Sequence, residues 1–347
     1  MTMYEASKEF VSKALSLLSE VGDVIELNYP RDQLRRTVDL ALKVKNREAV
    51  LLKLAYDAEL VGKDEREELK GLSFNLKLNA LIVAERRDGA KLVEGVVYDY
   101  GGSKLVSVDT LLNSVEGNYP AIYEEKDEFK VKINGEAMRS RRTLKGHSLG
   151  SLARAIKVSR KAIYDYEHEA IRPTLDVAER LVRELGEDIV AGIDVFGPSD
   201  DVMATSTPSL GTKPESPKEM LLARKLEELD MDFCHTRKAP LDFCLSRGEF
   251  KALVTVPHGS EKPRELSNKI HNMLRMAEFI GSRSFVITDD SPSIRELSWL
   301  DNALTIEEFE SILGEIVAAA TEEDNRDNRK ARNREDNTGA DNSQKRQ

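Results

Sequence analysis

The 347-residue chain contains only two cysteines, Cys234 and Cys244, and it has no apolar run that approaches the 18 residues of a membrane-spanning helix. Both cysteines lie in apolar, strand-like runs, which predicts two buried thiols in a cytoplasmic protein. A disulfide would form only if the two strands are neighbours. The amino-terminal segment lacks the apolar core of a signal peptide. We therefore expect a cytoplasmic protein that has no membrane contact.

Metal-ligand patterns are also missing from the sequence. No Cys/His motif has the spacing of a zinc site, and no group of side chains resembles a catalytic cluster. We therefore expect no catalytic residues, no metal and no cofactor. The histidines are scattered along the chain: His147, His168, His235, His258 and His271.

Capping residues and apolar stripes stand out between residues 134 and 186. Ser148, Ser159 and Thr174 are placed to begin helices as N-caps, and Gly186 is placed to end one. The spacing between these caps predicts four short amphipathic helices with a helix-turn-helix among them. The residues expected to face inward are Leu152, Ala153, Ile156, Val158, Ile163, Tyr166, Leu175, Ala178, Leu181 and Leu185.

The outward positions follow from this assignment. In a helix-turn-helix the first turn of the second helix reaches base edges in the major groove. Arg and Lys are the commonest partners of guanine. We therefore predict base contacts from Arg160, Lys161, Tyr164 and Asp165. Cations and helix N-termini near this helix would bind phosphates, and the predicted set is Lys145, His147, Ser148, Lys157, Ser159 and Arg172.

The local charge agrees with a DNA-binding role. Residues 134–173 carry nine Lys or Arg against four Asp or Glu, a net charge of +5, whereas the whole chain carries −10. A basic patch within an acidic protein is typical of a surface that binds a polyanion. We therefore expect double-stranded DNA as the partner. Solvation of a charged face is the simpler alternative.

The segment resembles the Cro/repressor-like (XRE-type) helix-turn-helix family. That resemblance implies an ion pair between Arg142 and Glu167 that joins the first and third helices. Lys157 stands where the family often has Gly, so it must adopt a left-handed conformation. Family Gln and Gly residues are also missing at Leu149 and near Glu169. The matching residues are Arg142, Gly146, Ser148, Leu152, Ala153, Val158, Ser159, Ile163, Tyr166, Glu167 and Pro173.

Two segments on either side of this motif repeat each other. The run that begins at Thr37 matches the run that begins at Pro240 without a gap, so that Asp39 falls on Asp242. In both copies a helix precedes the run, and a helix, a strand and a strand–helix unit follow it. A repeat of this length indicates duplicated domains, and mixed strands and helices predict α/β sandwiches.

The order of elements resembles the PD-(D/E)XK nucleases. In that family a strand-opening Asp and a Glu-x-Lys on the next strand hold a divalent metal. Asp39 and Asp242 fit the first position, but the next strands read Leu51-Leu52-Lys53 and Val254-Thr255-Val256, without the Glu. Glu20 and Glu228, late in the opening helices, are candidate further ligands or parts of a solvated face. One carboxylate holds Mg²⁺ poorly, so we expect two inactive domains.

The predicted organisation is two related α/β sandwich domains plus an all-α helix-turn-helix domain of four to five helices. The boundaries are 1–118 for the first α/β domain, 128–196 for the helix-turn-helix domain, 197–216 for a flexible linker, 217–319 for the second α/β domain and 320–347 for a disordered tail. The last two assignments rest on apolar patterning and on polar composition.

As a whole, the chain resembles a family of archaeal transcriptional regulators of helix-turn-helix type. We therefore expect a DNA-binding transcription regulator that acts as a homodimer, because one small helix-turn-helix contacts few base pairs. Two alternatives remain open at this stage. One is a metal-dependent endonuclease that the helix-turn-helix directs to DNA, and the other is a non-catalytic interaction scaffold. The operator, any effector and the direction of regulation stay open.

Overall fold

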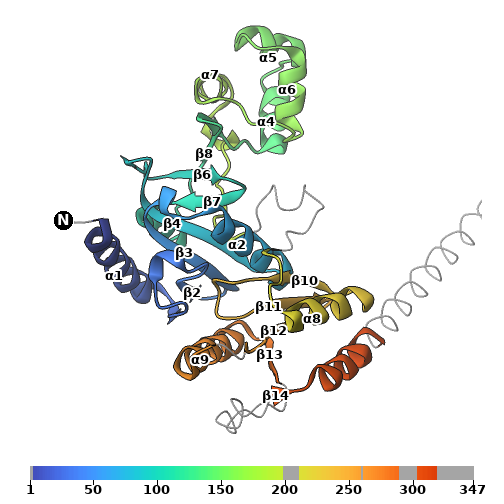
Figure 1. Ribbon diagram of the computed structural model, residues 1–347. Helices are drawn as coiled ribbons and strands as arrows, with labels where there is room; N and C mark the ends of the chain where they lie inside the picture. The colour runs from blue at the N-terminus through green and yellow to red at the C-terminus, as the bar shows by residue number, and fades with distance from the viewer. Residues whose placement is uncertain (1–2, 198–210, 259–260, 289–302, 319–347) are drawn as a thin grey trace, which may run out of the picture.

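The computed structural model describes residues 3–197, 211–258, 261–288 and 303–318. Figure 1 shows a helical part at one end of the molecule, a large sheet in the middle and a smaller sheet at the other end. The expected combination of α/β domains with a helical domain is thus confirmed. The predicted tail, and residues 198–210 of the predicted linker, lie outside the described residues.

The first lobe, residues 3–131 and 191–197, is built on a mixed sheet. β3 and β4 pair in parallel at its centre, and their side chains alternate between the two faces, with Leu81 and Val83 in one core and Ile82 and Ala84 in the other. The strand order is β1 (Asp23–Glu26), β2 (Leu40–Lys43), β3 (Ala49–Asp57), β4 (Asn79–Arg87), β7 (Ser103–Val106), β6 (Val96–Tyr100), β8 (Ile122–Glu125) and β9 (Glu128–Val131), with β5 (Ala90–Lys91) beside β4.

This sheet continues beyond residue 118, the predicted end of the first domain. β8 pairs with β6 in parallel and β9 pairs with β8 antiparallel. Residues 193–196 also return to the apolar core of this lobe. The first lobe therefore includes segments on both sides of the helical part.

Helices cover both faces of the large sheet. α1 (Met3–Val21) and α3 (Val108–Val115) bury Phe10, Ala14, Leu18 and Leu111 on one face. α2 (Lys63–Leu76) covers the other face with Leu69, Leu72 and Leu76. Two short 3-10 turns, η1 (Gln33–Arg35) and η2 (Ala58–Leu60), join these elements.

The second lobe comprises the described residues from 211 onward. Its sheet has the order β10 (Asp232–His235), β11 (Phe243–Arg247), β12 (Phe250–Thr255), β13 (Arg283–Ile287) and β14 (Ala303–Leu304). α8 (Pro217–Glu228) and helical residues 306–318 cover one face, and α9 (Pro263–Ile280) covers the other.

The two sheets share a pairing pattern. β1–β2–β3–β4–β7 and β10–β11–β12–β13–β14 both run antiparallel, antiparallel, parallel and parallel. Leu40 pairs with Leu52, whereas Phe243 pairs with Val254. The ungapped comparison is therefore wrong by one residue on the second strand, because the pair Lys43–Ala49 encloses residues 44–48 whereas the equivalent pair Ser246–Lys251 encloses only residues 247–250. The shared pattern supports a duplication.

α2 and α9 form a middle layer, since α2 contacts β4, β10 and β11, and α9 contacts β12, β13 and β1. Leu72 of α2, Met273 of α9, Ile82 of the large sheet and Leu253 of the small sheet belong to one apolar cluster. Burial of apolar area contributes roughly 25 cal/mol per Å². Each lobe therefore depends on the other for the burial of its inner face.

Polar contacts across this layer are reciprocal. Glu68 of α2, whose side chain is fully buried, accepts hydrogen bonds from the backbone N–H groups of Arg237 and Lys238 at 2.8 and 3.2 Å. In the opposite direction, Asn272 of α9 accepts a bond from the Asn28 N–H at 2.7 Å. Each middle-layer helix thus binds a loop of the other lobe.

The two cysteines are neighbours but unbonded. Cys234 on β10 lies directly opposite Cys244 on β11, and both are buried free thiols. Hydrogen bonding with Cys244 and burial raise the pKa of the Cys234 thiol. The expected buried thiols are thus confirmed. Within the described part of the chain no helix is both long and apolar enough to cross a bilayer.

Glu68→Ala is expected to lower the free energy of unfolding by about 2 kcal/mol, since it removes the acceptor of the Arg237 and Lys238 N–H groups and of the buried Thr37 hydroxyl. Urea denaturation followed by circular dichroism measures this change. Glu67→Ala, one residue away and partly exposed, is the matched control and should change stability by less than about 0.5 kcal/mol. Equal effects of the two substitutions would contradict an inter-lobe role for Glu68.

Candidate nucleic-acid interface

Four helices form the helical part, residues 133–190, around a core of their own. Leu152, Ile163 and Leu181 are fully buried there. The helices are α4 (Gly135–Leu144), α5 (Leu149–Ala155), α6 (Arg160–Glu167) and α7 (Leu175–Leu185), followed by a 3-10 turn, η3 (Glu187–Ile189).

The predicted caps begin the helices where the sequence places them. Ser148 Oγ accepts a hydrogen bond from the Ser151 N–H, and Ser159 Oγ accepts one from the Ala162 N–H, both at 3.0 Å. Thr174 occupies the N-cap position of α7, but its side chain makes no capping bond. Ser159 therefore fixes the start of α6, which is the second helix of the helix-turn-helix.

Leu175 is a wrong prediction among the expected core residues. It begins α7 and leaves 49% of its surface exposed, whereas Ala178, Leu181 and Leu185 are buried. α7 packs on β9, α4 and η3, and Leu175 at its first position lies outside the apolar core of the four helices. Val158, the expected corner residue, is half-buried against the core.

A buried ion pair joins α4 to the end of α6. Arg142 Nε and Nη2 donate to the two carboxylate oxygens of Glu167 at 2.5 and 3.0 Å, in the arrangement that the family resemblance implies. The hydrogen bond with Glu167 raises the pKa of Arg142. Because only 2% of the Glu167 side chain is exposed, this pair fixes the angle at which α6 is presented.

Two residues in this part hold left-handed backbone conformations. Lys157, in the turn between α5 and α6, has φ of 57°, and Glu169 after α6 has φ of 56°. An L-residue with a side chain pays roughly 1–2 kcal/mol for this conformation relative to Gly. The turn geometry of the fold is thus kept without its usual Gly residues.

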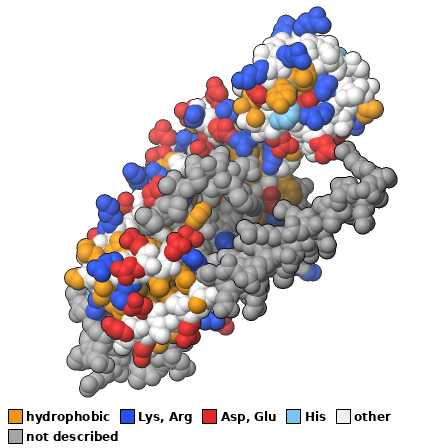
Figure 2. Space-filling model, turned by 90° about the vertical axis from the view of Figure 1, so that its right-hand side faces the viewer, with side chains coloured by type: hydrophobic (Ala, Val, Ile, Leu, Met, Phe, Trp, Pro, Cys, Tyr) orange, Lys and Arg blue, Asp and Glu red, His pale blue; other side chains and the backbone are white. Residues whose placement is uncertain are grey.

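The first turn of α6 faces solvent. Arg160, Lys161 and Tyr164 are exposed and Asp165 is half-exposed, so no described segment of the lobes covers the predicted base-reading face. Figure 2 shows Lys and Arg side chains gathered at the end of the molecule that the four helices form. The helix is therefore open to a large partner.

The sequence analysis missed an aromatic stack on the same helix. The rings of Tyr164 and His168 are 3.9 Å apart and stacked. His168 Nδ1 lies 2.7 Å from the Tyr164 carbonyl and so donates to it, which leaves Nε2 to accept from Arg139 Nη2 at 3.0 Å. The four-residue spacing was the available signal. The stack holds the Tyr164 ring in one orientation.

Three of the charged side chains predicted to contact phosphate already have protein partners. Lys145 Nζ donates to the Glu184 carbonyl at 2.6 Å, and His147 Nε2 lies 2.8 Å from the Glu184 carboxylate. Arg172 pairs with Glu125 of β8 and lies over the Tyr123 ring, 4.2 Å from its centroid. Lys157 is exposed, and Ser148 and Ser159 begin their helices beside it.

The helical part is tied to the first lobe at both of its ends. Lys132 N donates to the Ala121 carbonyl at 2.8 Å, and Ala191 N donates to the Lys132 carbonyl at 3.0 Å. Val131 N also donates to the Pro173 carbonyl at 2.9 Å. The four helices therefore have a defined orientation on the sheet.

The two nuclease-like aspartates are buried against lysines. Asp39 lies 3.1 Å from Lys53 of β3 and accepts the Leu54 N–H at 2.8 Å. Burial raises the pKa of Asp39, against the opposing effect of Lys53. Asp242 lies 2.6 Å from Lys269 of α9 and accepts the Val256 N–H at 2.8 Å. In each lobe the charge of the buried aspartate is thus balanced by a lysine ammonium group.

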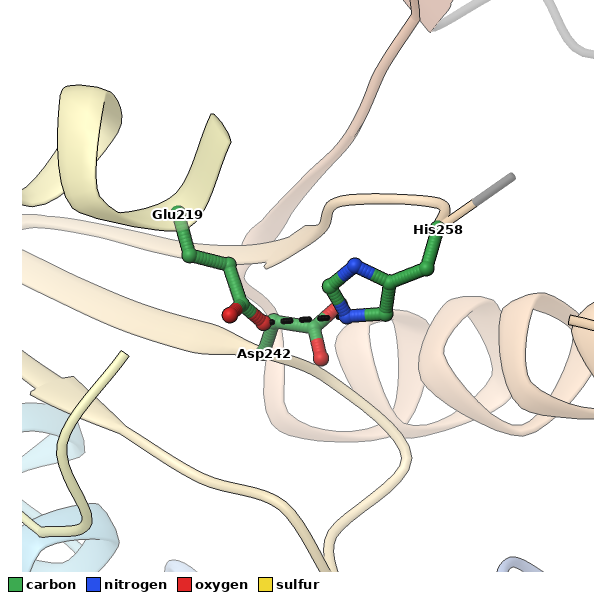
Figure 3. Close-up of side chains that lie close together, drawn as sticks. All are labelled: Glu219, Asp242 and His258. Carbon is green, nitrogen blue, oxygen red and sulfur yellow. Dashed lines mark ion pairs between the residues drawn. The ribbon is translucent and has the colours of Figure 1, made fainter. Parts of the chain in front are cut away.

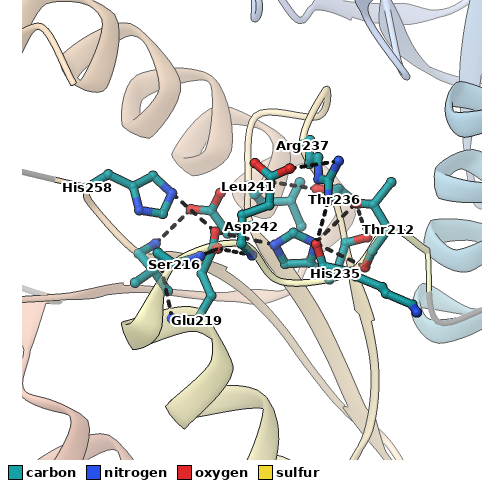
Figure 4. Close-up of polar contacts among 12 residues, drawn as sticks. Thr212, Ser216, Glu219, His235, Thr236, Arg237, Leu241, Asp242 and His258 are labelled. Atoms are coloured by element: carbon teal, nitrogen blue, oxygen red, sulfur yellow. Dashed lines mark hydrogen bonds and ion pairs between the residues drawn. The ribbon is translucent and has the colours of Figure 1, made fainter. Parts of the chain in front are cut away.

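Neither candidate ligand in the late part of the opening helices approaches these aspartates. Glu20 of α1 and Glu228 of α8 are exposed, as expected for a solvated face. A different residue of α8, Glu219, lies near Asp242 and His258 (Figure 3). Glu219 also forms a capping box with Ser216 in the first turn of α8 (Figure 4), and no residue spacing in the sequence links it to Asp242 or His258.

Two family models match the chain. The PD-(D/E)XK superfamily domain covers residues 7–120, and the helix-turn-helix model covers residues 138–191. The first match lies within the first lobe, and the second covers the helical part from within α4 to its end. No solved structure matches the chain.

Several curated proteins resemble most of the chain. A "Putative HTH-type transcriptional regulatory protein" of Aeropyrum pernix is 32% identical over 79% of this chain and 83% of its own length. Proteins with the same description in Methanocaldococcus jannaschii and Thermococcus gammatolerans are 31% and 30% identical, over 77% and 73% of this chain and 86% and 75% of their own lengths.

Lys157→Gly is expected to raise the free energy of unfolding by about 1 kcal/mol, because Gly adopts the left-handed conformation without strain. Thermal denaturation measures the gain. Lys161→Gly is the matched control, since it removes the same charge from within α6 and should lower stability by about 1 kcal/mol. A loss of stability in Lys157→Gly would show that the turn carries no strain.

Proposed function

The chain belongs to the family of archaeal helix-turn-helix transcriptional regulatory proteins, and on this premise we propose that α6 reads the major groove of DNA. The observation that carries the proposal is the exposed, cationic first turn of a helix whose start and angle are both fixed. Arg160 and Lys161 reach base edges from this turn. The stacked Tyr164 ring, beside Asp165, offers an apolar contact to a thymine methyl group.

Phosphate contacts divide into two groups in this proposal. The N–H groups at Ser148 and Ser159, with Lys157, hold the backbone directly beside α6. Lys145 and His147 would contact phosphate by exchanging their Glu184 partner. Arg172 would have to leave Glu125, so its role is more consistent with docking the four helices on the first lobe.

We propose that two chains act together on DNA. The related lobes pack against each other within one chain, so each chain contributes one helix-turn-helix. A second chain supplies the helix-turn-helix that binds the other half-site. Two recognition helices about 34 Å apart would match one turn of DNA. Because the proposed target is genomic DNA, we propose that the protein acts in the cytoplasm. In this arrangement the two lobes are non-catalytic and position the helix-turn-helix.

Selection of bound fragments from genomic DNA with the purified protein should return a palindromic motif. On that motif, Arg160→Ala is expected to weaken binding by about 1–3 kcal/mol and to relax base preference at one position. Gel-shift titrations at several salt concentrations measure both effects. Arg183→Ala on α7, which also removes an exposed Arg, is the control and should bind as the parent does. Unchanged affinity and selectivity of Arg160→Ala would refute the assignment of α6.

The interaction-scaffold alternative makes a different prediction for the same titrations. A protein that grips phosphates releases counterions, so its DNA affinity falls steeply as salt rises. A scaffold that uses the helix-turn-helix only for protein contacts would show no such slope.

The match to the PD-(D/E)XK superfamily supports a second candidate function, Mg²⁺-dependent cleavage of DNA. We expect supercoiled plasmid to stay intact with the protein and Mg²⁺, because the Lys53 ammonium already pairs with Asp39. Agarose electrophoresis checks this expectation. Nicking that Asp39→Asn abolishes would instead establish the nuclease.

A further inference from the structure

Arg160, Tyr164 and His168 form one stripe along α6 and its C-cap, because residues four positions apart lie on the same side of a helix. All three side chains are exposed, and 51% of the Tyr164 surface is open to solvent. The stripe begins with the residue that we assign to a base contact in the first turn of α6. It therefore places an aromatic ring one turn farther along the face proposed to meet DNA.

The Tyr164 ring is held by its stack with the His168 imidazole. The two ring centroids are 3.9 Å apart, and the ring planes are inclined by 29°. An exposed tyrosine ordinarily exchanges between staggered rotamers, and ordering such a side chain on binding costs free energy. Because the stack already orders the ring, this cost is smaller when a partner binds.

His168 is fixed in turn from two helices. Its Nδ1 donates to the Tyr164 carbonyl at 2.7 Å, within α6. Its Nε2 accepts from Arg139 Nη2 of α4 at 3.0 Å, so a second helix sets the plane of the imidazole. The orientation of the stack therefore does not depend on the side-chain torsions of α6 alone.

These contacts continue to the buried ion pair of the helix-turn-helix. Glu167 Oε2 accepts from Arg142 Nη2 at 3.0 Å and lies 3.5 Å from Arg139 Nε. A continuous series of contacts thus runs from the buried pair through Arg139 and His168 to the Tyr164 ring. Arg139 and His168 are exposed, and exposed polar contacts contribute little to stability. We therefore infer that they act on the orientation of the ring.

A ring fixed on this face suits one feature of the major groove. Thymine alone among the four bases presents a methyl group there, at C5. The exposed part of the Tyr164 ring is an apolar surface that can contact this methyl group. An ordered ring makes the contact with little further loss of side-chain entropy, so its order adds to the preference for thymine.

We propose that His168 and Arg139 are positioning residues for sequence recognition, and that they hold the Tyr164 ring against the C5-methyl group of one thymine in each half-site. This proposal rests on the major-groove role of α6 proposed above. It adds that one base preference depends on two residues that do not touch the base.

The test exchanges thymine for uracil, which removes the methyl group and leaves the hydrogen-bonding groups of the base in place. Each thymine of the fragment selected from genomic DNA is exchanged in turn, and the full-length protein is titrated with each fragment by fluorescence anisotropy. At one position of the half-site we expect uracil to weaken binding roughly fourfold, the effect of one buried methyl group. Tyr164→Ala should bind the thymine and uracil fragments equally.

Variants of the positioning residues are then compared at that position. His168→Ala should bind the two fragments nearly equally, whereas His168→Phe, which keeps a stacking ring, should retain most of the discrimination. Arg139→Ala should reduce the discrimination. Arg141→Ala, which removes a neighbouring exposed arginine of α4, is the control. It should keep the parent's ratio of the two affinities, even where the loss of positive charge weakens binding of both fragments.

Two results would overturn the proposal and leave α6 as the recognition helix. One is a half-site in which no exchange of thymine for uracil weakens binding, although Arg160→Ala still does. The other is full discrimination in both His168→Ala and Arg139→Ala. A protein that selects no DNA sequence would overturn this proposal together with the major-groove role of α6.

Discussion

The middle layer of helices is the constraint on which the rest of the molecule depends. α2 and α9 each present apolar side chains to both sheets, so neither lobe can bury its inner face alone. Glu68 and Asn272 then bind loops of the opposite lobe and set the register between the two halves. This arrangement joins two related lobes through one shared apolar core.

The two lobes share a topology but differ in the position of the lysine that pairs with the buried aspartate. Asp39 and Asp242 occupy the same place, and each accepts one backbone N–H from the neighbouring strand. The compensating ammonium comes from β3 in the first lobe and from α9 in the second. A buried carboxylate without a cation is strongly unfavourable. Thr255 now stands at the strand position of Lys53, so Lys269 had to provide the charge from elsewhere.

Local signals account for what the sequence could predict. Ser148 and Ser159 begin helices through bonds to residues three positions later, and such bonds are visible in the sequence. The predictions that failed depend on distant partners. Leu175, at the first position of α7, is 49% exposed and outside the core that Ala178 and Leu181 join, and Arg172 meets Glu125 only because β8 extends the sheet. Glu219 lies 23 residues from Asp242 and 39 from His258, so only folding brings them together.

The chain enters and leaves the four helices at adjacent points, because Lys132 and Ala191 are hydrogen-bonded to each other. Because these two points are adjacent, the four helices are inserted into the first lobe without separating any pair of its strands. The lobe can therefore have existed as a complete fold before it acquired the helices. In evolutionary terms the four helices are an exchangeable insertion. Their replacement would direct the protein to another operator and leave the two lobes unchanged.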